Sequence, residues 1–152
     1  MKYPYAAGLV LILLFTVQSL SAQTEPPLNQ HAPEKPKLFG SLPEKIEFSE
    51  TDLRGVFSSS ISDKINLKIN PSFIVDGFVT EKVQKNKNLI SINCVLPQYQ
   101  NALFNISMIN TNGVVRFTGR IVSPNHGDIL LLKKENEKYF LVKQAQKFTM
   151  VE

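Results

Sequence analysis

The chain has 152 residues, of which 43% are hydrophobic and 20% are charged, and its formal net charge is +4. A chain of this length suits one ordinary domain that buries a core without disulfides or structural metals. Lysines alternate with glutamates, as in KKENEKYF at 133–140, so the composition argues against a dedicated nucleic-acid binder. The single cysteine, Cys94, excludes an internal disulfide.

The first 22 residues have the three parts of a secretory signal peptide. Lys2 precedes an apolar run over residues 6–17, and polar residues then lead to the small residue Ala22. The run is shorter than the roughly 18 to 20 residues that span a bilayer. We therefore predict cleavage after Ala22 and export to the periplasm or the cell exterior, with no membrane contact afterwards. The alternative is a retained leader on a membrane-tethered structural subunit.

Residues 23–37, QTEPPLNQHAPEKPK, hold four prolines among polar residues. Such a composition cannot bury enough surface to order itself, so we predict a flexible tether in which His31 is incidental. From residue 38 a steady apolar periodicity begins. We predict a single domain over residues 38–152.

One short helix is predicted where the domain opens. Ser49 can cap its free N–H groups, and Asp52 stands at the third helical position. Phe48 and Leu53 occupy the positions of a hydrophobic staple. The apolar face is expected to consist of Leu53, Val56, Phe57 and Ile61. Gly55 and the serines at 58–60 weaken the helix, so it should be short.

After residue 63 the apolar period changes to two, which predicts strands bounded by turn residues. The expected strands are 64–69, 72–83, 88–96, 102–109, 114–122, 129–133 and 138–143. Connections this short cannot contain crossover helices, so neighbouring strands should pair antiparallel. The predicted fold is α+β and mainly antiparallel β, with one short N-terminal helix packed on a curled six- to seven-stranded meander or half-barrel.

Alternation along the strands separates the core from the surface. The predicted core positions are Ile90, Ile92, Cys94, Leu96, Ala102, Phe104, Ile106, Met108, Val115, Phe117, Gly119 and Ile121. Cys94 is therefore interpreted as a buried small hydrophobe. Gly77 and Gly119 lie inside strands, where glycine marks a bulge, a bend or a close backbone approach. Both favour a strongly curled sheet.

The stretch TGRIVSPNHGDILLL, residues 118–132, places His126 and Asp128 between two apolar runs. A metal site needs three or four ligands, and this pair supplies two, so no metal and no cofactor is predicted. A small secreted hydrolase using His126, Asp128 and a serine is an alternative, because such a group assembles in space. The favoured interpretation is a hairpin turn, in which Asn125 and Gly127 tolerate positive φ and Asp128 bonds backbone N–H groups.

Arg116, Thr118 and Arg120 alternate with the core positions and should face outward on one strand. The two arginines then lie about 13 Å apart at ~3.3 Å per residue. Guanidinium groups spaced in this way can hold carboxylates or phosphates of a peptide or polyanion. The alternative is a solvated sheet face with cross-strand ion pairs. Arg116, Thr118, Arg120 and His126 are the predicted binding residues.

The leader ending in SAQ, the strand SFIVDGFVTEKV, the stretch FTGRIVSPNHGDILLL and the segment KYFLVK resemble short, uncharacterised exported proteins of Bacteroidota. The resemblance covers about residues 38–151, with Ile129 where such proteins often carry an aromatic residue or glycine. It implies export and fold, and it assigns no role to any residue.

Together these features predict an exported, non-enzymatic, β-rich binding module. Its partner is expected to be an envelope or extracellular protein, a peptide or a polyanion, engaged through the arginine face or an open sheet edge. The module itself is expected to be a monomer.

Overall fold

The computed structural model describes residues 34–71 and 73–145, which belong to one compact unit of the chain, residues 34–152. Residues 1–33 lie outside the described residues, and with them the predicted signal peptide, most of the predicted tether and His31. In the described part of the chain, no helix is long and apolar enough to span a membrane.

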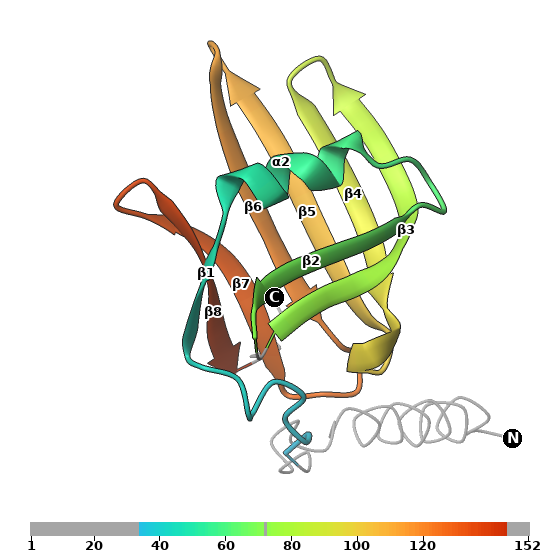
Figure 1. Ribbon diagram of the computed structural model, residues 1–152, viewed down its shortest axis with the longest axis vertical. Coiled ribbons are helices and arrows are strands. Elements are labelled where there is room, and N and C mark those ends of the chain that lie inside the picture. The colour runs from blue at the N-terminus through green and yellow to red at the C-terminus, as the bar shows by residue number, and fades with distance from the viewer. Residues whose placement is uncertain (1–33, 72, 146–152) are drawn as a thin grey trace, which may run out of the picture. The chain divides into compact units, whose positions relative to one another are not determined.

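Within the described ranges, eight strands, one α-helix and one 3-10 helix follow one another along the chain (Figure 1). They are β1 Lys45–Phe48, α2 Glu50–Ser58, β2 Lys64–Asn70, β3 Phe73–Asn86, β4 Leu89–Leu96, η1 Pro97–Tyr99, β5 Ala102–Thr111, β6 Val114–Val122, β7 Asp128–Glu135 and β8 Lys138–Ala145. The strands form one antiparallel sheet in the order β1-β8-β7-β6-β5-β4-β3-β2. The sheet is barrel-like and nearly closed, and α2 lies across it between its two edge strands (Figure 1).

The predicted class, mainly antiparallel β with one short α-helix, is confirmed, but the predicted six or seven strands fall short by the strand β1. This strand has only four residues, with Ile46 and Phe48 as its two inward apolar side chains. It pairs with β8, at the far end of the chain, where Phe48 stands opposite Tyr139. Local periodicity does not reveal a strand of four residues whose partner lies at the other end of the domain. The helix therefore follows a strand instead of opening the domain.

The helix α2 begins as its sequence predicts. The Ser49 side chain accepts a hydrogen bond from the Thr51 N–H at 3.2 Å, and Leu53, Val56 and Phe57 are buried. Ile61 was expected on this apolar face, but it is 58% exposed. The helix ends at Ser58, because the serines after it leave the helical conformation, so Ile61 lies beyond the buried face.

The predicted core is largely confirmed. The buried positions among those predicted are Ile92, Cys94, Leu96, Ala102, Phe104, Ile106, Phe117 and Ile121. Ile90, Met108, Val115 and Gly119 are only partly buried, and the first three pack against the buried core. Burial raises the pKa of the Cys94 thiol to about 11, so the thiol stays protonated at neutral pH. Cys94 is thus a core residue.

Gly77 and Gly119 allow neighbouring strands to approach closely, as predicted. A Cβ atom at Gly119 would lie 2.5 Å from the Asn105 carbonyl oxygen of β5, and one at Gly77 would lie 2.3 Å from the Val95 carbonyl oxygen of β4. No real Cβ atom tolerates such contacts with backbone. The two glycines therefore let the sheet curl at β3 and β6.

We expect Gly119→Ala to lower the free energy of unfolding by about 1 to 3 kcal/mol, because the β5 backbone must move to admit the methyl group. Gly55→Ala is the matched control. A Cβ at this exposed helical position meets no atom within 4 Å, so its better helix propensity should raise stability by roughly 0.5 to 1 kcal/mol. Urea denaturation measures both changes. Similar effects of the two substitutions would contradict the close approach at Gly119.

Candidate functional site: the cleft between β6 and β7

Strands β6 and β7 pair over only part of their length. The register joins residues 119–122 of β6 to residues 129–132 of β7. However, β6 begins at Val114, and β7 continues to Glu135. The β7–β8 hairpin turns away from β6 over this remaining length (Figure 1). The first half of β6 therefore has a backbone edge without a β7 partner in the middle of the sheet.

The strands separate because β7 is held along its whole length by β8, and β8 is held by β1. Tyr139 of β8 fills the space at the point of separation, where it is 1% exposed. Its hydroxyl oxygen accepts a hydrogen bond from the Phe117 N–H of β6 at 3.2 Å, and the two rings meet edge to face at 5.5 Å. A side chain thus takes the place of the missing strand partner.

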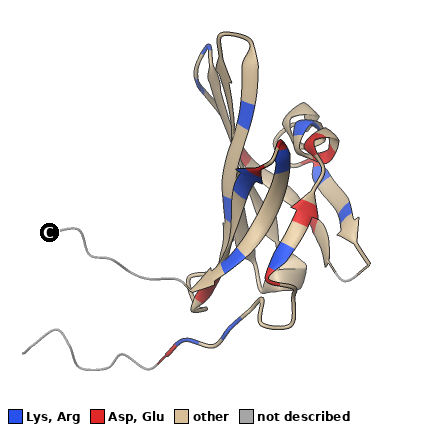
Figure 2. Cartoon of the chain, turned by 90° about the vertical axis from the view of Figure 1, so that its left-hand side faces the viewer, with Lys and Arg blue, Asp and Glu red and all other residues tan. Residues whose placement is uncertain are grey.

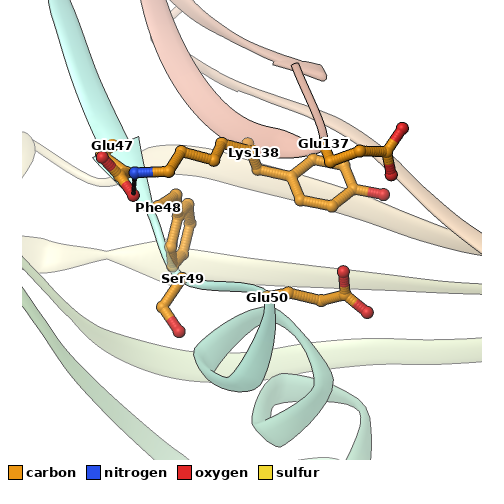
Figure 3. A pocket seen from close by; sticks show the side chains of 7 residues that line it. Glu47, Phe48, Ser49, Glu50, Glu137 and Lys138 are labelled. Atoms are coloured by element: carbon orange, nitrogen blue, oxygen red, sulfur yellow. Dashed lines mark ion pairs between the residues drawn. The ribbon is translucent and has the colours of Figure 1, made fainter. Parts of the chain in front are cut away.

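Two hollows adjoin the β7–β8 hairpin, and we call them together the β6/β7 cleft, although only the first is lined by residues of β6. The first, of about 290 Å³, is lined by Arg116, Phe117, Lys134, Asn136, Glu137 and Tyr139. The second, of about 270 Å³, is lined by Glu47, Phe48, Ser49, Glu50, Glu137, Lys138 and Tyr139 (Figure 3). They share Glu137 and Tyr139, so the hairpin between β7 and β8 forms the wall between them. Figure 3 shows the Glu50 and Glu137 carboxylates directed to one side and the Lys138–Glu47 ion pair on the other.

Most charges of the cleft are already paired. Lys134 contacts Glu137 at 2.5 Å, Lys138 contacts Glu47 at 2.9 Å, and Glu50 at the rim contacts Arg54 of α2 at 2.6 Å. Figure 2, which views the unit from this side, shows basic and acidic residues interspersed. These pairs are exposed, so each contributes little to stability. Their effect is to neutralise most of the charges on the walls of the cleft.

Arg116 is the exception among the cleft cations, since it makes no ion pair with any residue in 34–71 or 73–145. Its charge reaches Glu137 nevertheless. The hydrogen bond and charge of Lys134 hold the pKa of the Glu137 carboxyl below its usual range, and the Arg116 charge adds to this effect. The guanidinium group of Arg116 is exposed at the open edge of β6. It is therefore available to an incoming carboxylate.

Glu137 occupies an unusual backbone position. Asn136 and Glu137 form the two-residue turn of the β7–β8 hairpin, with φ of 47° and 63°. Such turns favour Asn-Gly, because a side chain at positive φ is strained. A glycine would suit this backbone better, but it would bring no carboxylate to the cleft. The strained glutamate therefore favours a role for its side chain.

Of the predicted binding residues, the structure brings only Arg116 into the cleft. Thr118 and Arg120 are exposed on the same outer face of β6, opposite Ser107 and Asn105 of β5. The outward orientation predicted from strand alternation agrees with this exposure. Lys134, Glu137 and Tyr139 were not predicted as site residues, since KKENEKYF has the pattern of an ordinary solvated hairpin. The one local signal was a glutamate where a tight turn prefers glycine.

His126 lies in the loop between β6 and β7, it lines neither hollow of the cleft, and it is only 6% exposed. Its Nδ1 lies 2.8 Å from the Ser123 hydroxyl oxygen, and its backbone N–H donates to the Ser123 carbonyl at 3.2 Å. The chain turns here as predicted. However, neither Asn125 nor Gly127 has the positive φ that the sequence allowed. Gly127 instead gives room to the Lys35 carbonyl oxygen, 2.9 Å from where its Cβ would stand.

This loop holds the N-terminal end of the domain. Both carboxylate oxygens of Asp128 accept backbone hydrogen bonds, from Leu38 at 2.7 Å and from the buried Phe39 at 2.8 Å. The Gly127 N–H donates to the Pro36 carbonyl at 2.9 Å, and the Lys35 ammonium donates to the Pro124 carbonyl at 2.7 Å. The last residues of the predicted tether, 34–37, therefore contact the domain. Asp128 acts as an anchor for this segment.

The same contacts bear on the hydrolase alternative. Ser123 stands within hydrogen-bond reach of His126, which is the first requirement of a nucleophile and base. A catalytic triad also needs a third group, which orients the histidine. Asp128 is committed to two backbone N–H groups, and no hydrogen bond joins it to His126 among the described residues. The geometry therefore supports an anchor better than a catalytic group.

Across the described ranges, no cluster of three or more histidine, cysteine, aspartate or glutamate side chains is arranged to hold a metal ion. Comparison of the chain with known protein families, with curated proteins and with solved structures finds no match.

We expect Asp128→Asn to lower the free energy of unfolding by about 1 to 3 kcal/mol, because one acceptor oxygen becomes an NH₂ group facing an N–H donor. The Leu38 and Phe39 amide resonances should shift at the same time. Asp76→Asn is the control, since this carboxylate makes a surface ion pair with Lys64, and its loss should cost less than about 1 kcal/mol. Unchanged stability together with unchanged resonances in Asp128→Asn would refute the anchor.

Proposed function

We propose that the chain is an exported, non-enzymatic binding module that takes an extended, acidic segment of an envelope or extracellular protein into the β6/β7 cleft. One observation carries the proposal. The pairing of β6 with β7 stops at Gly119, while β6 continues as a strand to Val114 with Arg116 at its open edge. Open strand edges accept added strands, and the unpaired guanidinium supplies the charge preference.

The backbone of β6 is suited to strand addition. The Phe117 N–H points toward the cleft, since it donates to the Tyr139 hydroxyl. Backbone groups alternate in direction along a strand, so the N–H and carbonyl of Val115 point to the same side. An extended segment lying about 4.8 Å from β6 would meet both groups of Val115. Main-chain pairing would then provide affinity without demanding one sequence.

The side chains of the cleft favour a carboxylate on the incoming segment. Arg116 presents a planar fork that can hold a carboxylate through two parallel hydrogen bonds. Lys134 stands on the opposite wall, although Glu137 already neutralises it. Phe117 and Tyr139 form an apolar floor between the two walls. A segment with acidic and apolar side chains in alternation would match this arrangement.

The non-enzymatic part of the proposal rests on the chemistry of the lining. The Ser49 hydroxyl is engaged in capping α2, and the Tyr139 hydroxyl is engaged with the β6 backbone. Histidine and cysteine are absent from the residues that line the two described hollows. Export rests on the leader at residues 1–22, outside the described residues.

The test is the binding of a labelled synthetic peptide of alternating glutamate and valine, followed by fluorescence anisotropy. We expect Arg116→Glu to weaken binding about tenfold or more, because like charges would then meet at the open edge. Changing the glutamates of the peptide to glutamine should weaken binding to the natural chain in the same way.

Arg120→Glu is the matched control, since it makes the same substitution on the same face of β6 but outside the cleft. It should leave the peptide affinity nearly unchanged. Equal binding by the natural chain and Arg116→Glu, or an equal loss in Arg120→Glu, would rule out the cleft as the binding site.

A further inference from the structure

The outer face of the sheet carries an exposed apolar row at right angles to the strands. The register places one outward residue from each of four adjacent strands side by side, and these are Phe78, Val95, Leu103 and Val122. We call them the outer apolar row. Phe78 is 46% exposed and Leu103 is 42% exposed, although both are large hydrophobic side chains. Ile129 of β7 continues the row beside Val122. A contiguous apolar strip of this kind marks an interaction surface.

A polar row runs beside it on the same face. The register aligns Glu81, Asn93, Asn105 and Arg120, which we call the outer polar row. Its amides are joined, since Asn105 donates to Asn93 and Asn93 donates to Glu81. Its charged ends do not meet within one chain, because three strand spacings of about 4.8 Å separate Glu81 from Arg120. Neither of these two residues makes an ion pair within the described part of the chain.

The two rows are complementary to themselves. Consider a two-fold axis parallel to the strands and lying between β4 and β5. Rotation about this axis brings β4 of one copy over β5 of the other, and β3 of one copy over β6 of the other, within the same row. The resulting contacts are Val95 with Leu103, Phe78 with Val122, Asn93 with Asn105 and Glu81 with Arg120, each formed twice. Apolar side chains meet apolar ones, amides meet amides, and the carboxylate meets the guanidinium.

The curvature of the sheet fits the same arrangement. Two convex sheets touch most closely near the axis and diverge toward the flanks. In the outer polar row, the shorter side chains, Asn93 and Asn105, lie on the central strands β4 and β5. Long side chains stand at the flanks, where Glu81 and Arg120 can bridge the wider gap. In the outer polar row, side-chain length thus increases where the distance between copies would increase.

We infer that the outer face of β3–β6 is a dimer interface that takes a second copy of this chain, held by the outer apolar row and by reciprocal Glu81–Arg120 ion pairs. This inference departs from the monomer expected from the sequence, and it is independent of the β6/β7 cleft. Arg116 stands four residues before Arg120 on β6, opposite Ile109 of β5, so it belongs to neither row.

The test is a charge exchange followed by sedimentation equilibrium, on protein purified from cells that express the full chain. Glu81→Arg places like charges opposite Arg120 of the partner copy, and Arg120→Glu does the same to Glu81. We expect each single variant to raise the dimer Kd about tenfold or more. The double variant restores opposite charges across the axis, so it should recover the natural Kd to within about threefold. Leu103→Asp should also abolish the dimer, because it places a carboxylate at the centre of the apolar row.

Lys85→Glu is the control, since it reverses an exposed charge away from both rows and should leave the Kd unchanged. Circular dichroism of every variant establishes that the fold is kept. A chain that is monomeric at all soluble concentrations would overturn the inference, and so would a dimer that responds to neither single variant. A double variant as weak as the single variants would overturn it as well. If the copies associated through residues 1–22 instead, the double variant would not recover the natural dimer Kd, and this result too would contradict the inference.

Discussion

The rest of the structure depends on how β7 pairs with its two neighbouring strands, β6 and β8. This strand pairs with β8 over its whole length and with β6 over four residues, so it must leave β6 where β8 and β1 lead toward α2. Tyr139 compensates for this separation. Its hydroxyl oxygen accepts the hydrogen bond of the Phe117 N–H, which a backbone carbonyl of β7 would accept if the two strands stayed paired. The aromatic contact between Tyr139, Phe117 and Phe57 then joins the separated strand to the helix. The sheet is thereby open at one position while the core beneath it stays closed.

The two ends of β6 border regions that differ in the exposure and bonding of their polar groups. Its first half borders the β6/β7 cleft, where exposed charges and an open backbone edge suit a partner. Its end leads into the loop of Ser123 to Asp128, where the polar groups are buried and already bonded within the chain. Buried groups with full partners stabilise a fold, whereas exposed groups without partners remain available for binding. This contrast is why we propose Arg116, and not His126, as a binding residue, although histidine is the more conspicuous residue in the sequence.

Local features of the structure could be predicted from the sequence, and features that depend on distant pairing could not. Alternating residues and turn residues located the seven later strands to within a few positions, and the Ser49 cap located the start of α2. Strand alternation also placed Arg116 and Arg120 on the surface. The strand β1, the separation of β7 from β6 and the position of Tyr139 depend on contacts between residues far apart in the chain. No periodicity near Lys45 or Lys134 contains that information. The close approach at Gly119 was partly predictable. A glycine inside a strand indicated it, but the group that approaches, the Asn105 carbonyl, is known only from the structure.

Amide hydrogen exchange along β6 tests most directly whether the sheet is open at this position. We expect the Val115 amide, which faces the cleft, to exchange much faster than the Ile121 amide, which stands opposite Leu130 of β7. The Phe117 amide, bonded to a tyrosine hydroxyl, should exchange at an intermediate rate. Protection of Val115 equal to that of Ile121 in the unbound chain would show that the edge is closed, and it would contradict the cleft as a site for strand addition.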